Sequence, residues 1–350
     1  MKIEVYSPTI RRKEMDAVLT AMVEEKIGPG DRSRQLTQIA KEQLRFDYAL
    51  ALRSPTVALH LALKAVGIQF GQKAAILSPL SPKYYLQVLE DLHITPLFCD
   101  VTYDFPCLNK ELIENTIAKK PAGLEIGVIL LHHTLGYEPD TASIAELGIP
   151  IIEDISQSYG SWILKENPNP KADGVFYILG LEERDMLTSG GGALLFAMNR
   201  KEGSSLRAFA GLSNEYCLPD INAALAVVQF KEIQRNIERR RDIAEVFIHA
   251  SLSLAARTKH KRFVPIKDNE YCNYSFSLVL EAGLKDVLTY AKKKEIEIDN
   301  AFGNTIIGAG LCEGCPVSSS LVLRTVLFPL YPRLRSQDVE RVSRLIMTIP

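Results

Sequence analysis

The stretch IIEDISQSYG, residues 151–160, decides the fold that we expect for this chain. It continues an apolar run that starts at Ile149 and ends on two acidic residues, Glu153 and Asp154. A short apolar run of this kind is typical of a strand buried on both faces of a parallel sheet. Asp154 would then stand at the carboxyl end of the strand, where α/β sheets place their ligands. An ordinary helix N-cap after a strand is the alternative role for this aspartate.

Similar runs lie on both sides of this stretch and alternate with helical patterns. The predicted strands are Ala74–Leu77, Thr95–Cys99, Val128–Leu131 and Ile149–Ile152. The predicted helices between and around them are Thr56–Val66, Lys83–Leu92 and Lys110–Lys119. Repeated strand–helix units imply right-handed crossovers, and therefore an α/β fold with a doubly wound, mostly parallel sheet.

The pattern changes after a long predicted helix at Asp220–Phe247. It is followed by a strand-like segment, YSFSLVLE (274–281), and by helices at Leu284–Lys294 and Ser336–Met347. We therefore predict a large domain over residues 1–235 and a smaller C-terminal α+β domain over residues 236–350, joined through the long helix.

Composition and charge exclude several classes of protein. Of the 350 residues, 47% are apolar and 24% are charged, which is the balance of a folded soluble protein. The 41 Lys and Arg residues are offset by 42 Asp and Glu residues, so nucleic acid is not an expected partner. No apolar run approaches the roughly 20 residues that span a bilayer, and the start of the chain has no signal-peptide pattern. We expect a cytoplasmic protein without membrane contact.

Six cysteines are too sparse for a disulfide scaffold in a chain of this length. Only Cys312 and Cys315 form a C-x-x-C pair, a spacing found in half of a zinc site or in a redox pair. Because no second pair of zinc ligands has comparable spacing, we predict no metal site. Two ordinary thiols in a turn are the favoured interpretation.

Four segments resemble, in the right order, the DegT/DnrJ/StrS sugar aminotransferases, which are fold-type I pyridoxal phosphate (PLP) enzymes. The segments are RSPTVALHLAL (53–63), IIEDISQSYG (151–160), MLTSGGGALLF (186–196) and LVLRTVLFPLYPRLRSQDVERVSRLI (321–346). The resemblance implies a fold-type I aminotransferase fold, with a large mostly parallel-sheet domain flanked by helices and a smaller C-terminal α+β domain. It also implies a homodimer, because the family builds its active site across a dimer interface.

The resemblance assigns roles to several residues. It implies that Asp154 pairs with the pyridinium nitrogen of PLP and that Gln157 contacts the ring hydroxyl. The phosphate would lie at the start of the helix that Ser54, Thr56 and Val57 open, where N–H groups favour an anion. A plain N-cap at Ser54 or Thr56 is equally compatible with these residues.

The family's Schiff-base lysine is missing. The family pattern K.lttGeGG, placed on Gly191 and Gly192, puts Arg184 at the lysine position, and a slip of one residue offers Glu183 or Asp185. No lysine occurs from residue 172 to residue 200. Arginine cannot replace it, because a guanidinium stays protonated and is a poor nucleophile toward an aldehyde.

Other positions depart from the family pattern as well. The family's glycine at the phosphate segment is Pro55, which lacks an N–H donor. The phosphate-binding serine maps to Leu179, and the residue that packs on the ring maps to Pro82, with Tyr84 and Tyr85 nearby. Several departures at one site indicate that the site is no longer under the constraints that PLP binding places on the family.

Three functions follow as hypotheses. The favoured one is a degenerate family member that forms no internal aldimine and has a binding or regulatory role toward a nucleotide-sugar-like ligand or a partner. The alternative is an aminotransferase- or dehydratase-type enzyme of nucleotide-sugar or polysaccharide biosynthesis that holds PLP or pyridoxamine phosphate (PMP) non-covalently, with Arg184 as an anion clamp. The third is an ordinary sugar aminotransferase that uses a lysine from elsewhere, such as Lys83.

Overall fold

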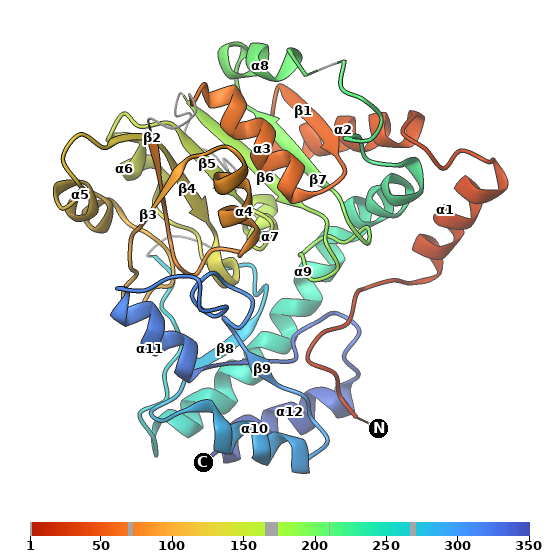
Figure 1. Ribbon diagram of the computed structural model, residues 1–350. Helices are drawn as coiled ribbons and strands as arrows, with labels where there is room; N and C mark the ends of the chain where they lie inside the picture. The colour runs from red at the N-terminus through yellow and green to blue at the C-terminus, as the bar shows by residue number, and fades with distance from the viewer. Residues whose placement is uncertain (1, 69–72, 165–173, 210, 267–270) are drawn as a thin grey trace.

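A seven-stranded sheet forms the centre of the larger part of the molecule, in the order β1-β7-β6-β5-β4-β2-β3 (Figure 1). The computed structural model describes residues 2–68, 73–164, 174–209, 211–266 and 271–350. The strands are β1 (Tyr48–Leu52), β2 (Lys73–Leu77), β3 (Thr95–Phe98), β4 (Glu125–His132), β5 (Ile151–Asp154), β6 (Val175–Gly180) and β7 (Ala193–Ala197). The five neighbouring strands β3, β2, β4, β5 and β6 run parallel to one another. Strand β7 is antiparallel to both of its neighbours, β6 and β1. The predicted mostly parallel α/β sheet is confirmed.

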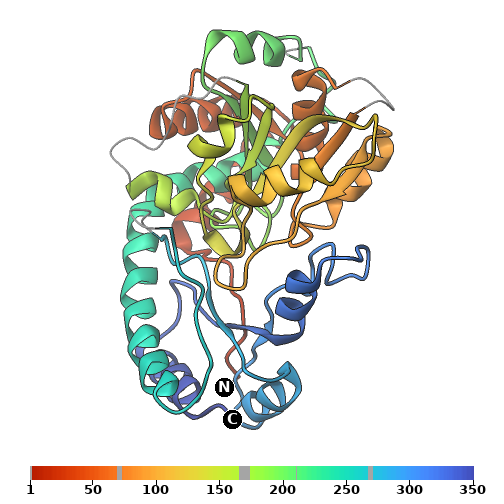
Figure 2. The same ribbon diagram turned by 90° about the vertical axis from the view of Figure 1, so that its left-hand side faces the viewer.

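Helices cover both faces of this sheet (Figure 2). One face packs against α2 (Asp31–Leu44), α5 (Lys110–Ala118), α6 (Thr141–Ala145), α7 (Tyr159–Leu164) and the first half of α9 (Asp220–Ala255). The other face packs against α3 (Pro55–Val66), α4 (Tyr84–Asp91) and α8 (Arg200–Arg207). A further helix, α1 (Arg12–Val23), packs on α9.

Side chains alternate between the two faces, as the two-residue period of a strand requires. On β5, Ile151 packs with the α2 side of the sheet and Ile152 with the α3 side. The same alternation turns Glu153 toward the α2 side and Asp154 toward the α3 and α4 side. The predicted place of Asp154 at the carboxyl end of a buried strand is confirmed, because it is the last residue of β5.

The smaller part of the molecule is built on a three-stranded sheet, β8-β10-β9. Its elements are β8 (Phe276–Val279), α10 (Leu284–Lys293), β9 (Asp299–Asn300), α11 (Pro316–Arg324), β10 (Thr325–Phe328) and α12 (Ser336–Thr348). Helix α9 runs from the large sheet into this part in both views (Figures 1 and 2). It extends beyond the predicted end at Phe247, because Ala250 and Leu254 still pack into the smaller core.

The predicted domain division at 235/236 falls inside α9 and stays a prediction. The buried residues of α9 up to Ile237 belong to the core of the large sheet, and those from Ile243 onward belong to the smaller core. Ile3 near the N-terminus also packs into the smaller core. No helix within the described ranges combines the length and the apolar character needed to cross a membrane.

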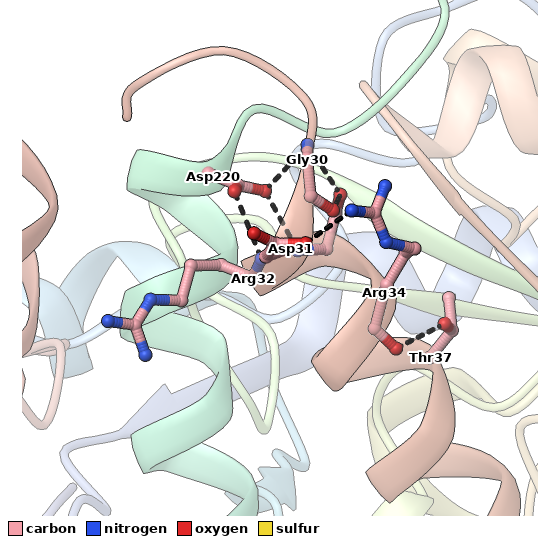
Figure 3. Close-up of polar contacts among 7 residues, drawn as sticks. Gly30, Asp31, Arg32, Arg34, Thr37 and Asp220 are labelled. Atoms are coloured by element: carbon pink, nitrogen blue, oxygen red, sulfur yellow. Dashed lines mark hydrogen bonds and ion pairs between the residues drawn. The ribbon is translucent and has the colours of Figure 1, made fainter. Parts of the chain in front are cut away.

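A buried carboxylate at the start of α9 holds the first turn of α2 (Figure 3). Asp220, which is 2% exposed, accepts the N–H groups of Gly30, Arg32 and Ser33 at 2.9, 3.0 and 2.8 Å. A Cβ atom on Gly30 would lie 2.9 Å from the Asp220 carboxylate, so only glycine permits this approach. The anion satisfies helix-end donors that α2 cannot pair within itself and lies at the positive end of its dipole.

We expect Asp220→Ala to lower the free energy of unfolding by about 2–4 kcal/mol, since it leaves three partly buried N–H groups without their acceptor. Urea denaturation at neutral pH measures the change. The matched control is Asp31→Asn, which removes an exposed carboxylate that pairs with Arg34 in the same turn and should cost less than about 0.5 kcal/mol. Equal effects of the two substitutions would contradict this role of Asp220.

Candidate functional site

Asp154 lies at the carboxyl end of β5 with its carboxylate fully engaged by protein groups. The hydroxyls of Tyr84 and Tyr85, in the first turn of α4, donate to Oδ2 at 3.2 and 2.9 Å. Ser156 donates its N–H at 3.0 Å and its hydroxyl at 2.5 Å to Oδ1. A carboxylate offers about four lone-pair sites, so these four donors fill the hydrogen-bonding capacity of Asp154.

Both tyrosine hydroxyls act as donors in this arrangement. Burial raises the pKa of Tyr84 and of Tyr85 well above the usual value of 10.0, and the charge of Asp154 raises it further. The two rings lie edge to face with their centroids 5.0 Å apart, so each ring holds the other in place. The hydroxyls therefore keep their protons and their direction toward Oδ2.

A second carboxyl group, that of Asp185, lies beside the first. A Cβ atom on Gly180 would collide with Asp185 Oδ2 and would also reach Ser156 Oγ, so glycine at the end of β6 makes room for this carboxyl. The N–H of Glu182 donates to the same oxygen at 2.9 Å. Burial and then the charge of Asp154 raise the pKa of Asp185 to about 8, which favours the protonated form of this carboxyl group at neutral pH.

Arg184 lies elsewhere. Its side chain is 54% exposed, 3.8 Å from Asp299 Oδ2 on β9 and 6.0 Å from the ring of Tyr6. Its carbonyl oxygen accepts the Tyr274 hydroxyl at 2.7 Å. The sequence offered three residues for the lysine position. The structure places Asp185 near Asp154, whereas the side chain of Arg184 lies near Asp299 on β9.

The other residues assigned from the sequence have partners of their own. The Ser54 hydroxyl caps α3 by accepting the Val57 N–H at 3.3 Å, and Thr56 lies between them in the first turn. Gln157 accepts the N–H of Leu135 on its side-chain oxygen at 2.7 Å. The structure therefore realises the N-cap alternative at Ser54, which uses one N–H of the predicted phosphate segment.

A serine–histidine–glutamate chain on the opposite face of the sheet is structural. His133 lies 2.7 Å from Glu153 Oε1 and 2.5 Å from Ser158 Oγ, and Thr141 donates to the same Glu153 oxygen at 2.8 Å. All four residues are buried, and Ser158 has no exposed surface. No substrate can reach this serine. The hydrogen-bond network therefore holds β4, β5 and α6 together and does not activate Ser158 as a nucleophile.

These residues do not fit PLP as the resemblance implies it is held. A Schiff base needs an amine, and the loop after β6 brings a carboxyl group, that of Asp185, near Asp154 and contains no lysine. The carboxylate that would face the pyridinium nitrogen is already satisfied by Tyr84, Tyr85 and Ser156. At the start of α3, Pro55 has no N–H and the Val57 N–H is engaged. Within the described ranges, no three His, Cys, Asp or Glu residues form a group that could bind a metal ion.

Ser156 is the residue of this cluster that the sequence did not reveal. Its signal was its place two residues after Asp154, where a hydroxyl can turn back to a carboxylate. The sequence places Tyr84 and Tyr85 only near the ring-packing position, and the structure shows that both bind Asp154.

Several solved structures have the same fold. The aminotransferase TlmJ from Streptoalloteichus hindustanus matches with a TM-score of 0.84 and 19% identity, over 99% of this chain and 98% of that one. A putative sugar aminotransferase, Spr1654 from Streptococcus pneumoniae in its PMP form, matches with a TM-score of 0.85 and 16% identity, over 100% and 98%. A DegT DnrJ EryC1 StrS aminotransferase from Brucella abortus matches with a TM-score of 0.81 and 20% identity, over 95% and 94%. The predicted fold-type I architecture is confirmed.

The model of the DegT/DnrJ/EryC1/StrS aminotransferase family matches residues 8–167 and 193–347. The interval between the two ranges, 168–192, contains Gly180, Arg184 and Asp185, where this chain departs most from the family pattern. The matched ranges cover far more than half of the chain. The chain therefore belongs to the DegT/DnrJ/EryC1/StrS aminotransferase family.

Proposed function

We propose that this chain forms no internal aldimine and acts as a cytoplasmic binding or regulatory protein within its sugar aminotransferase family. The observation that carries the proposal is the Asp185 carboxyl beside Asp154, where a catalytic lysine would be required. A second carboxyl group near a buried carboxylate favours its own protonated form, and it excludes neither a ligand nor a partner from the surrounding surface. The ligand class that the family resemblance implies is a nucleotide sugar.

The departures support one another. Gly180 admits the Asp185 carboxyl, Ser156 binds Asp154 next to it, and Tyr84 and Tyr85 close the other side of Asp154. If PLP were absent and no protein group took its place, the Asp154 carboxylate would be buried and unpaired, which is costly. Here the same pocket has gained the donors that satisfy it, as expected if PLP no longer does.

Non-covalent binding of PLP or PMP is the second candidate. It is supported by Asp154 at the end of β5 and by the start of α3, which keep their places in the fold. It requires the hydroxyls of Tyr84 and Tyr85 to leave Oδ2, and it gives Arg184 no part at Asp154, since that side chain lies against Asp299.

We also propose that the protein is a homodimer, as the resemblance implies. Helix α1 exposes a stripe of large apolar side chains at helical spacing, namely Met15, Leu19, Met22 and Val23, which are between 51% and 84% exposed. An apolar stripe of this kind is typical of a protein–protein contact, and a second copy of the chain is the occupant that we propose.

The cofactor prediction compares the natural protein with Arg184→Lys. After incubation with equimolar PLP, we expect neither protein to develop imine absorbance or a borohydride-stable adduct in the peptide that carries residue 184. The reason is that the side chain of residue 184 does not face Asp154 and the Asp154 carboxylate has no vacant acceptor site. An adduct in the natural protein overturns the proposal. An adduct in Arg184→Lys alone would show that only the lysine was lost. Reversible PLP absorbance without an adduct would favour the second candidate.

The proton on Asp185 should give stability a characteristic pH dependence. Its pKa rises from 3.8 to about 8 on folding, so the folded state binds more protons than the unfolded state between these values. The contribution is therefore complete below about pH 4 and is lost as the pH rises through 8. Relative to Asp185→Asn, the natural protein should lose stability across this window in urea titrations. The neighbouring Glu182→Gln variant should follow the natural protein, and parallel curves for all three proteins would contradict the raised pKa.

The dimer prediction rests on Leu19, in the middle of the α1 stripe. We expect light scattering to give twice the chain mass for the natural protein and a monomer for Leu19→Glu, because a carboxylate would be buried in the contact. Leu323→Glu, at an exposed leucine on α11, is the matched control and should remain dimeric. A monomeric natural protein, or a dimeric Leu19→Glu, would refute the contact.

A further inference from the structure

Cys312 and Cys315 lie side by side at the start of α11. Their Sγ atoms are 3.8 Å apart. Cys315 is buried, whereas Cys312 is partly exposed. Gly314, between them, has a φ of 80°, a left-handed conformation that favours glycine and turns the chain tightly enough for the two side chains to meet.

The chain around this pair is fastened to the large sheet on both sides. Downstream, Asp100, which follows β3, accepts the N–H groups of Val317 and Ser318, each at 2.9 Å, and so caps α11. Upstream, the N–H groups of Ile306 and Ile307 donate to the carbonyls of Ser81 and Pro79, each at 3.0 Å.

The upstream contact reaches the candidate site. Residues 79–82 lead directly into the first turn of α4, where Tyr84 and Tyr85 bind Asp154. The segment 305–318 therefore crosses from the smaller domain onto the large one, and we call it the strap. Ile306 and Ile307 attach one end of the strap, and Val317 and Ser318 attach the other. The dithiol lies between its two attachment points.

We propose that Cys312 and Cys315 are a modification site, at which a reversible disulfide forms and tightens this strap. The proposal is independent of the proposed function. It contrasts with the interpretation favoured from the sequence, because two thiols in a turn need not face each other, and these two do.

The reaction needs a disulfide of low molecular weight as the oxidant. The Cys312 thiolate attacks one sulfur of that disulfide, forms a mixed disulfide and releases one thiol. Cys315 loses its proton and attacks the sulfur of Cys312, which releases the second thiol and closes the protein disulfide. In sum, the two cysteines lose two electrons and two protons, and the small disulfide is reduced to two thiols.

The surroundings set the order of these steps. Cys312 is the sulfur that solvent can reach, and Cys315 lies behind it as the resolving thiol. Burial raises the pKa of both thiols, and more strongly for Cys315, where Cys312 and Asp100 add to the effect. Formation should therefore be slow at neutral pH and faster as the pH rises, because the thiolate is the reactive form.

The test is a titration of the full-length natural protein with oxidised and reduced glutathione, followed by alkylation and peptide mass mapping. We expect a Cys312–Cys315 link, seen as the loss of two hydrogens, which dithiothreitol reverses. Cys312→Ser should abolish it. Cys217→Ser, which removes a partly exposed thiol elsewhere, should leave it unchanged. A lasting glutathione adduct on Cys312, a link between Cys99 and Cys315, or free thiols throughout would each overturn the proposal.

A second measurement tests the tightening of the strap. In the oxidised protein, hydrogen exchange at the amides of Ile306 and Ile307 should be slower than in the reduced protein, at least several-fold. Exchange at the β5 amides, which lie in the sheet, should be unchanged. Equal exchange at Ile306 and Ile307 in the two states would show that the disulfide forms without acting on the strap.

Discussion

The candidate site depends on how one buried carboxylate, that of Asp154, is satisfied. A charge at the end of a buried strand must be paired or fully hydrogen-bonded to remain there. The family resemblance implies a pyridinium nitrogen as its partner. In this chain the donors are two tyrosine hydroxyls, a serine hydroxyl and a backbone N–H, all supplied by the protein. Asp154 thus lies where the resemblance places it, and its partners in the structure are protein groups.

The loop after β6 also differs from what the resemblance implies. A lysine would place a positive charge near Asp154, whereas Asp185 places a second acid there, and burial together with the charge of Asp154 raises the pKa of that acid. Because Gly180 has no side chain, the Asp185 carboxyl group has room to lie there. Arg184 keeps its cation in solvent near Asp299, where an exposed ion pair contributes little to stability. The fold of the family is therefore present here with side chains that differ from those that the resemblance implies around PLP.

The sequence predicted the parts of the structure that follow from a regular period. The apolar run before Asp154 determined the strand, its burial and the edge of the sheet at which the carboxylate lies. The loop from Leu181 to Gly192 has no period, so the sequence could not decide which of Glu183, Arg184 and Asp185 turns inward. That choice depends on the missing side chain at Gly180, which leaves room for Asp185, and on the hydroxyl of Ser156, which lies in a segment distant in sequence. The end of α9 was misplaced for a similar reason, since packing in the smaller core extends it.

The most direct test is a crystal structure of the protein grown with a large excess of PMP, the form of the coenzyme that needs no lysine. We predict that Tyr84 and Tyr85 remain on Oδ2 of Asp154, that Asp185 remains beside Ser156, and that no ring lies against them. A PMP ring with its nitrogen on Asp154 and its phosphate at the start of α3 would contradict the account, because it would show that the carboxylate still serves the coenzyme.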